Sequence, residues 1–352
     1  MKTLKEINIK TNTPYKILIG ENLLQYSGEY VKKLTCAKKV LIVTDDIVHN
    51  LYAHVVSKSL RDAGFKVFYF IFNHGEQSKN LKNVEKVYSS LIENEFTRQD
   101  LIIALGGGVS GDLAGFAAAT YMRGIDYIQI PTTLLSQIDS SIGGKTGVNL
   151  MQGKNLVGAF FQPRLVLVDI ATLNTLSDEI ISDGMAEAIK YALIKSPSLF
   201  YKINNSELKD IIFELVVECI KIKKEIIQKD EKELGKRKLL NFGHTLGHAI
   251  ENFYNYSRYS HGQAVAIGMA SIVKSCEKLL LTKKGTYCEL ISVLEKYNLP
   301  YEIDCNIDDL VSISKTDKKA SDQCLDIILI ESIGKSYVKR IHKDDFKKYI
   351  GG

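Results

Sequence analysis

The 352-residue sequence contains no tryptophan, only five prolines, and six cysteines that form no CxxC pair. This cysteine usage excludes a disulfide framework and indicates reduced thiols. The chain has no apolar run near the ~20 residues that span a bilayer, and its first ten residues, MKTLKEINIK, lack the apolar core of a secretory signal. We therefore expect a cytoplasmic protein with no membrane partner.

Neither sign of charge predominates in the sequence. There are 46 basic and 41 acidic residues, and the net charge of +5 is too small and too dispersed to indicate a nucleic-acid partner. Apolar residues are 45% of the chain and charged residues 25%, which are ordinary globular values that exclude a disordered or collagen-like chain. The length suggests about two domains.

Short apolar runs alternate with helical stretches in the first half of the chain. The runs of strand length are INIK (7–10), YKILI (15–19), VLIVT (40–44), VFYFI (67–71), LIIALG (101–106), YIQIP (127–131) and LVLVD (165–169). Such alternation predicts a Rossmann-like, mostly parallel sheet with helices on both faces. We expect an α/β N-terminal domain over residues 1–175.

The second half of the sequence is mainly helical in its spacing. A single helix face is predicted over 212–226, and further helices are predicted over 183–195, 238–254, 262–281 and 285–297. A hairpin is predicted at 325–341, with its turn at Gly334-Lys335. We expect a mainly α-helical C-terminal domain over residues 176–352.

A glycine-rich turn follows the run LIIAL. Residues 106–111 (GGGVSG) fit G-x-G-x-x-G between a strand and a helix, where backbone amides donate to a pyrophosphate. Asp45-Asp46, at the end of an earlier strand, offers a carboxylate for ribose hydroxyls. The alternative is a turn that only packs the helix closely on its strand.

Residues 141–146 (SIGGKT) resemble the end of a nucleotide-binding P-loop. The full pattern requires glycine where this chain has Asp139, and a carboxylate there would repel a nucleotide phosphate. We therefore exclude an ATPase and keep Lys145 as a candidate for binding an anion.

A polar stripe lies in the predicted helix 238–254 and the residue before it. Arg237, Asn241, His244 and His248 are spaced by 4, 3 and 4, which places them on one face of a helix. His-x3-His is a metal-ligand spacing, although two structural histidines are the alternative. Helix geometry alone favours His244 and His248 as ligands.

Two further groups of residues strengthen a metal site. His261 precedes a predicted helix, and Glu187 and Lys190 share a face of an otherwise apolar helix, as a site or a simple ion pair. One carboxylate and two imidazoles can hold zinc and leave a position open for a substrate oxygen. The spacing does not decide which two histidines bind.

Taken together, these motifs make the chain resemble the 3-dehydroquinate synthase family of the shikimate pathway, over nearly its whole length. The matching blocks include HGEQSKN (74–80), LGGGVSGDLAGFAA (105–118), YMRGI (121–125), PTTLLSQIDSSIGGKTGVNL (131–150), GKNLVGAFFQP (153–163), GMAEAIKYALI (184–194), RKLLNFGHTLGHAIE (237–251) and HGQAVAIGM (261–269). The resemblance implies metal ligands at Glu187, His244 and His261. It assigns His248 to a position next to the metal ligands or to proton transfer, instead of metal binding.

The resemblance also implies the residues of the NAD and substrate sites. The NAD site is carried over to Asp45, His74, Gly75, Glu76, Gln77, Ser78, Lys79, Gly108, Val109, Ser110, Gly111, Asp112, Thr132, Thr133, Lys145, Lys154, Thr172, Leu173, Asn174 and Thr175. The catalytic and substrate site is carried over to Arg123, Asp139, Lys145, Asn155, Lys190, Lys223, Arg237, Asn241 and His248. Lys318 and Lys319 resemble a contact on the phosphate side. Ser78, Ser110, Asn174 and Gln263 depart from the commonest family residues.

The implied activity is conversion of 3-deoxy-D-arabino-heptulosonate 7-phosphate to 3-dehydroquinate and phosphate. It proceeds by transient oxidation with NAD, phosphate elimination, re-reduction, ring opening and an intramolecular aldol closure. The implied cofactors are NAD and a divalent zinc or cobalt ion, and the implied assembly is a homodimer. There are three alternatives. The first is another sugar phosphate cyclase, such as a 2-deoxy-scyllo-inosose synthase, the second is a metal-dependent polyol dehydrogenase, and the third is a catalytically silent NAD- or metal-binding protein.

Overall fold

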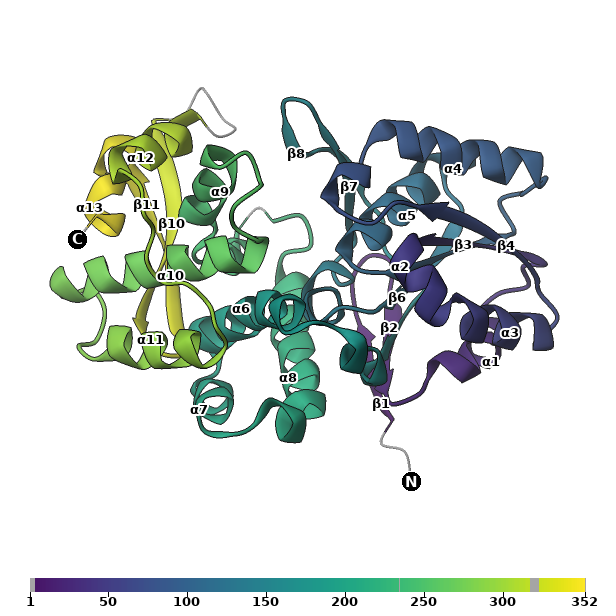
Figure 1. Ribbon diagram of the computed structural model, residues 1–352, viewed down its shortest axis with the longest axis horizontal. Helices are drawn as coiled ribbons and strands as arrows, with labels where there is room; N and C mark the ends of the chain where they lie inside the picture. Colours follow the sequence, from purple (N-terminus) through teal and green to yellow (C-terminus); the bar gives the residue numbers. More distant parts are fainter. Residues whose placement is uncertain (1–3, 234, 317–322, 352) are drawn as a thin grey trace. The chain divides into compact units, whose positions relative to one another are not determined.

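The computed structural model describes residues 4–233, 235–316 and 323–351 (Figure 1). The chain divides into two compact units, with the boundary between Leu176 and Ser177. A mostly parallel sheet forms the N-terminal unit and helices dominate the C-terminal unit, which confirms the predicted fold class.

The N-terminal unit is built on a seven-stranded sheet in the order β1-β2-β9-β6-β5-β3-β4. Only β1 is antiparallel to its neighbour. The strands are β1 (Lys5–Ile9), β2 (Tyr15–Gly20), β3 (Lys39–Asp45), β4 (Lys66–Phe72), β5 (Leu101–Gly106), β6 (Asp126–Pro131) and β9 (Leu165–Asp169). All seven strand-length runs predicted from the sequence form these strands. β5 is buried at every residue because the sheet is covered on both faces.

Two helical layers cover this sheet. The helices and 3-10 or π segments are η1 (Leu24–Tyr26), α1 (Ser27–Lys32), α2 (Asp46–Val48), η2 (His49–Ala53), α3 (His54–Asp62), η3 (Glu76–Ser78), α4 (Leu81–Glu93), α5 (Gly108–Thr120), η4 (Tyr121–Arg123), η5 (Ser136–Ser140) and η6 (Ile170–Thr175). Val40 and Ile42 pack with α1 and α3, whereas Leu41 and Val43 pack with α4 and α5. The alternation follows from the two-residue period of a strand.

A small antiparallel hairpin accompanies the sheet. It consists of β7 (Lys145–Leu150) and β8 (Gly153–Phe160), and it was not among the predicted elements. Residue 149 forms an isolated bridge with Asn80, which ties the hairpin to the segment after β4.

The C-terminal unit combines helices with one hairpin. Its elements are α6 (Asp178–Lys195), α7 (Pro197–Asn205), α8 (Leu208–Lys229), η7 (Lys236–Asn241), α9 (His244–Phe253), α10 (His261–Lys278), α11 (Thr286–Lys296), α12 (Ile307–Thr316), β10 (Cys324–Ser332), β11 (Lys335–His342), η8 (Lys343–Asp345) and α13 (Phe346–Ile350). The predicted hairpin at 325–341 is present as β10 and β11, which pair antiparallel.

The single helix predicted over 238–254 is wrong. The chain forms the 3-10 segment η7, turns at Gly243 with φ +79°, and starts α9 at His244. Glycine adopts this left-handed conformation without a steric penalty. Arg237 and Asn241 therefore do not share a continuous helix with His244 and His248.

None of the helices in the described part of the chain combines the length and apolar character needed to cross a bilayer.

Candidate active site

The sheet of the N-terminal unit has a topological switch point between β3 and β5. The connection from β3 leads outward to β4, whereas that from β5 leads the other way to β6. Ligands of open α/β sheets bind at the carboxyl ends of strands at such a point. Asp45 ends β3 and the glycine turn follows β5, so both lie at this point.

The glycine turn leaves the first amides of α5 open to an anion. Gly107 caps the helix without a side-chain hydrogen bond. Gly106 has φ +149°, and a Cβ built on it would lie 2.3 Å from Ser110 Oγ and 3.3 Å from Asp45 Oδ2. The turn therefore needs glycine and holds Asp45 beside it. These features fit the pyrophosphate and ribose of a dinucleotide.

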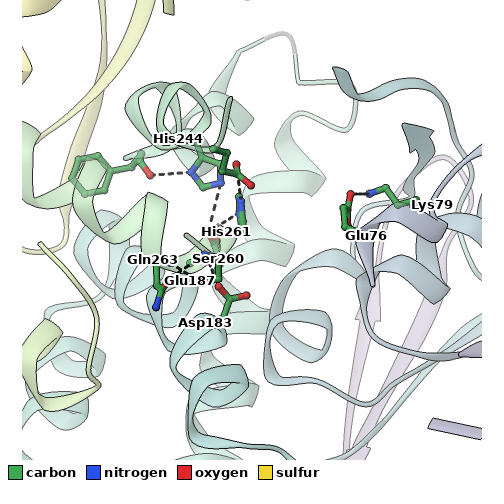
Figure 2. A network of polar contacts seen from close by, with 11 residues as sticks. Glu76, Lys79, Asp183, Glu187, His244, Ser260, His261 and Gln263 are labelled. Carbon is green, nitrogen blue, oxygen red and sulfur yellow. Dashed lines mark hydrogen bonds and ion pairs between the residues drawn. The ribbon is translucent and has the colours of Figure 1, made fainter. Parts of the chain in front are cut away.

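Lys79 connects the segment after β4 to α5. Its buried Nζ donates to Asp112 Oδ2 at 2.8 Å and lies 3.5 Å from Glu76 Oε1, an ion pair visible in Figure 2. Burial opposes the charged form, but the charges of Asp112 and Glu76 raise the pKa of Lys79 above its ordinary value. Asn149 of β7 donates to Glu76 at 2.7 Å. This network fixes η3 against the start of α5.

The other residues implied for NAD follow the carboxyl ends of further strands. Residues 74–79 follow β4, Thr132 and Thr133 follow β6, and Thr172–Thr175 lie in η6 after β9. Ser110 Oγ and Thr132 Oγ1 are buried and have no hydrogen-bond partner among the described residues. Lys145 begins β7 and Lys154 lies in β8.

A cluster of one carboxylate and two imidazoles lies in the C-terminal unit. Glu187 comes from α6, His244 begins α9 and His261 begins α10 (Figure 2). The Nε2 atoms of His244 and His261 lie 3.6 and 3.8 Å from Glu187 Oε1, and one ligand atom from each residue lies within 4.8 Å of the others. Ligands at the usual zinc distances are separated by about 3.5 Å in a tetrahedron, so the cluster fits a divalent cation.

Hydrogen bonds select the ring atoms that face the centre of this cluster. His244 Nδ1 is 3.1 Å from the Phe242 carbonyl, to which it can only donate, so Nε2 carries the lone pair. Burial, followed by the charge of Lys190, lowers the pKa of His244 well below its ordinary value. His244 is therefore a neutral imidazole, the form that binds a metal.

His261 is positioned by residues that the sequence analysis did not identify. Its Nδ1 lies 3.4 Å from Glu251 Oε2, and the next residue, Gly262, donates its amide to Asp183 on α6. Burial disfavours its charged form, but the hydrogen bond and charge of Glu251 raise the pKa of His261. Ser260 and Gln263 form a capping box at the start of α10. Gln263, which departs from the commonest family residue, therefore still caps this helix. Glu251 could have been identified from the sequence as an acidic residue within an otherwise mostly apolar helix.

Glu187 itself indicates that this centre accepts a cation. The residue is 1% exposed, and neither carboxylate oxygen accepts a hydrogen bond from the described residues. Lys190 forms a close ion pair with Oε2, as its i, i+3 spacing suggested. Lys190 compensates the charge at Oε2, whereas Oε1 faces the two imidazoles and remains available to a cation.

His248 lies beside this cluster and not within it. The residue is exposed, and its ring centroid is 5.5 Å from that of His244 and 6.3 Å from that of His261. His248, Glu251 and His261 form a second group of possible ligands. The pair favoured by helix geometry alone, His244 and His248, does not occur with Glu187 in either group.

Three cations implied for the substrate are buried in the C-terminal unit. The exposed fractions are 2% for Lys190, 5% for Lys223 and 1% for Arg237. They come from α6, α8 and η7, which pack against one another. Lys223 was identified by the resemblance alone, although a lysine beside Ile222 on the apolar face of a helix was a usable signal.

Asn241 and Arg237 contact the segment before η7. Asn241 Nδ2 donates to Glu233 Oε1 at 2.8 Å, and Arg237 donates to the carbonyl of Glu231. In this structure these donors therefore bond to acceptors of the chain itself.

The remaining implied residues belong to the N-terminal unit. Asp139 lies in η5, and Asn155 lies in β8 with φ +55°. Arg123 lies in η4, before β6, and so at the opposite edge of the sheet from the glycine turn. The fold does not bring Arg123 to the other residues of this unit's set. Lys318 and Lys319 lie outside the described residues.

Comparison with known proteins gives matches over most of the chain. The families described as 3-dehydroquinate synthase N-terminal and C-terminal match residues 69–183 and 184–320. The 3-dehydroquinate synthase of Clostridium acetobutylicum is 44% identical and covers 99% of both chains.

Solved structures of related cyclases share the fold. A 2-deoxy-scyllo-inosose synthase complexed with carbaglucose-6-phosphate, NAD+ and Co2+ is 26% identical, with a TM-score of 0.86 and 99% of both chains covered. A 2-epi-5-epi-valiolone synthase from Streptomyces hygroscopicus subsp. jinggangensis 5008, with NAD+ and Zn2+ bound, is 25% identical, with a TM-score of 0.86 and 97% of both chains covered.

Proposed function

Because this chain belongs to the 3-dehydroquinate synthase family, we propose that it converts 3-deoxy-D-arabino-heptulosonate 7-phosphate to 3-dehydroquinate and phosphate. The reaction makes it a carbon–oxygen lyase that uses NAD and a divalent cation. The NAD+ and the Co2+ or Zn2+ in the two related cyclases support this choice of cofactors.

The observation that carries the proposal is a candidate metal cluster in the same unit as three buried cations. Glu187, His244 and His261 form the cluster, and Lys190 makes its ion pair with Glu187. Arginine and lysine are the side chains that bind carboxylates and phosphates in charge-assisted hydrogen bonds. The substrate supplies a carboxylate and a phosphate. A polyol substrate has neither group, which favours the cyclase over a polyol dehydrogenase.

Glu187 and the Nε2 atoms of His244 and His261 would hold the divalent cation. When bound there, the cation stabilises negative charge on a substrate hydroxyl oxygen. The hydrogen bonds that the two imidazoles donate to the Phe242 carbonyl and the Glu251 carboxylate keep both rings oriented for this task.

The N-terminal unit would hold NAD at its switch point. NAD bound there would supply a reversible hydride acceptor, so none would be consumed. The amides at the start of α5 would donate to its pyrophosphate, and Asp45 would accept from its ribose hydroxyls. Lys79 keeps the segment after β4 in place through Asp112.

The polar side chains of the C-terminal unit would orient the substrate. Arg237, Lys223 and Lys190 bind its anionic groups, and Asn241 fixes a hydroxyl. His248 is exposed next to the cluster, where its ring can accept and return a proton.

A coupled assay of phosphate release from the heptulosonate, with and without a chelator, tests the proposal. We expect release that depends on metal and catalytic NAD, with no net absorbance of NADH at about 340 nm. Stoichiometric NADH would indicate a polyol dehydrogenase, and phosphate released only from another sugar phosphate would indicate a different cyclase. Absence of any release would indicate a silent binding protein. The homodimer and the cytoplasmic location remain predictions.

A further inference from the structure

The C-terminal unit contains a cavity of about 500 Å³ that the proposed reaction does not use. It is lined by the end of α6, the last turns of α8, residues 336–338 of β11, and Gly235, Lys236, Lys238 and Leu239. This volume is within the range of small-molecule sites. None of the residues proposed to bind substrate, NAD or metal lines it.

The charges around the cavity are predominantly positive. Four lysines and one acid, Glu225, line it. Glu225 accepts from both Lys195 and Lys229, at 3.1 and 2.7 Å, and Lys238 is paired with Asp326 at 2.6 Å. Asp326 and Asp230, whose carboxylate accepts from the amide of Gly235 in the lining, bring the count to four positive charges against three negative ones. Lys236 is exposed and has no ion-pair partner in the described ranges. The excess of positive charge favours an anionic ligand.

The rest of the lining is apolar. Ile226, Leu239, Tyr337 and Val338 contribute to it, and burial raises the pKa of the Tyr337 hydroxyl. Side chains of this kind gain free energy by covering a ring or an alkyl chain. A ligand complementary to both parts carries a phosphate at one end and an apolar ring at the other.

Three elements connect the cavity to the candidate substrate residues. Lys195 ends α6, which also carries Lys190, and Glu225 lies on α8, which also carries Lys223. The third element is η7, which gives Lys236, Lys238 and Leu239 to the cavity and Arg237 and Asn241 to the substrate. A ligand that contacts neighbouring residues of one short 3-10 segment restrains the whole segment.

We propose that this cavity is an effector site for a phosphate monoester with an apolar ring, and that its occupation tightens substrate binding by Arg237 and Asn241. The second part rests on the proposed function. Coupling of this kind requires only that the effector favours the η7 conformation that also binds substrate.

Titration of phenyl phosphate into the protein loaded with zinc and NAD, followed by calorimetry, tests the site. We expect saturable binding that weakens about fivefold in Lys236→Gln and changes less than about twofold in Lys209→Gln, an exposed position on α8 far from the cavity. Inorganic phosphate, which lacks the ring, binds at least about tenfold more weakly. At saturating phenyl phosphate, the KM for the heptulosonate falls at least about twofold in the wild type and stays constant in Lys236→Gln.

Three results would overturn the effector site. The first is equal binding by Lys236→Gln and Lys209→Gln, and the second is equal affinity for inorganic and phenyl phosphate. The third is loss of binding in Arg237→Gln but not in Lys236→Gln, which would put the probe in the substrate site. An unchanged KM would refute the coupling. Failure of the proposed function would instead appear as no turnover of heptulosonate without any probe, and it leaves the calorimetric result intact.

Discussion

We predict that Gly243→Ala destabilises the C-terminal unit and weakens its hold on zinc. Gly243 has φ +79°, which costs alanine about 1 kcal/mol. An added Cβ would also lie 2.7 Å from Met269 Cγ and 2.8 Å from the Val265 carbonyl oxygen on α10. The backbone atom cannot yield cheaply, so overpacking adds about 2 kcal/mol, for a total of about 3 kcal/mol.

Gly285→Ala is the matched control for this substitution. Gly285 has φ +94°, precedes α11, and has nothing within 4 Å of an added Cβ. Alanine at this position therefore costs only the conformational free energy of about 1 kcal/mol. At roughly 3 °C per kcal/mol, the unfolding midpoint falls about 9 °C in Gly243→Ala and about 3 °C in Gly285→Ala.

The two variants should also differ in zinc content. Gly243 directly precedes His244, and its carbonyl accepts the first helical hydrogen bond of α9 from Gly247 at 3.0 Å. Displacing this turn from α10 moves His244 relative to His261, and we expect about tenfold weaker zinc binding. Mass spectrometry of metal content after dialysis against buffered zinc measures this. Equal midpoints and equal zinc affinities in the two variants would refute the reasoning.

Three further predictions concern single side chains. Lys79→Met leaves the largely buried Asp112 without its ion-pair partner, so the protein should lose about 2–4 kcal/mol of stability and bind NAD more weakly. The double variant Lys79→Met, Asp112→Asn should recover stability in denaturation experiments, but titration should show that it does not recover NAD affinity. His261→Ala should lose metal and activity with its circular dichroism unchanged, and a metal-free variant with full activity would contradict the ligand assignment. Arg237→Ala should raise the KM for the heptulosonate about tenfold or more while the Kd for NAD stays constant, and equal losses of both would contradict its role.

The strands of the sheet were predictable because each is a short apolar run bounded by turn residues. Burial of β5 on both faces produces the uninterrupted LIIAL sequence, and the glycines that follow it mark the turn into α5. The hairpin of β7 and β8 was missed. Glycines and polar residues interrupt its two strands, and its outer face is half-exposed, so no apolar alternation marks it.

The metal cluster was only partly predictable from spacing. Helical periodicity pairs His244 with His248, because it indicates neighbours along one helix and carries no information on contacts between helices. The partner of His244 comes from another helix, and Gly243 interrupts the stripe just before it. The sequence offered His261 as one of three candidate histidines, and only the family resemblance identified it as a ligand. The supporting contacts of Glu251 and Asp183 depend on how α9, α10 and α6 pack, which periodicity does not encode.

The position of Glu187 has a consequence for how the protein exchanges its cation. The carboxylate is 1% exposed, and the side chain of His261, at 31%, is the most accessible of the three ligands. A bound cation would first lose its contact with His261 on α10. It would then have to lose its contacts with Glu187 and His244, which are more deeply buried. A cation held here would therefore exchange only when these helices open locally.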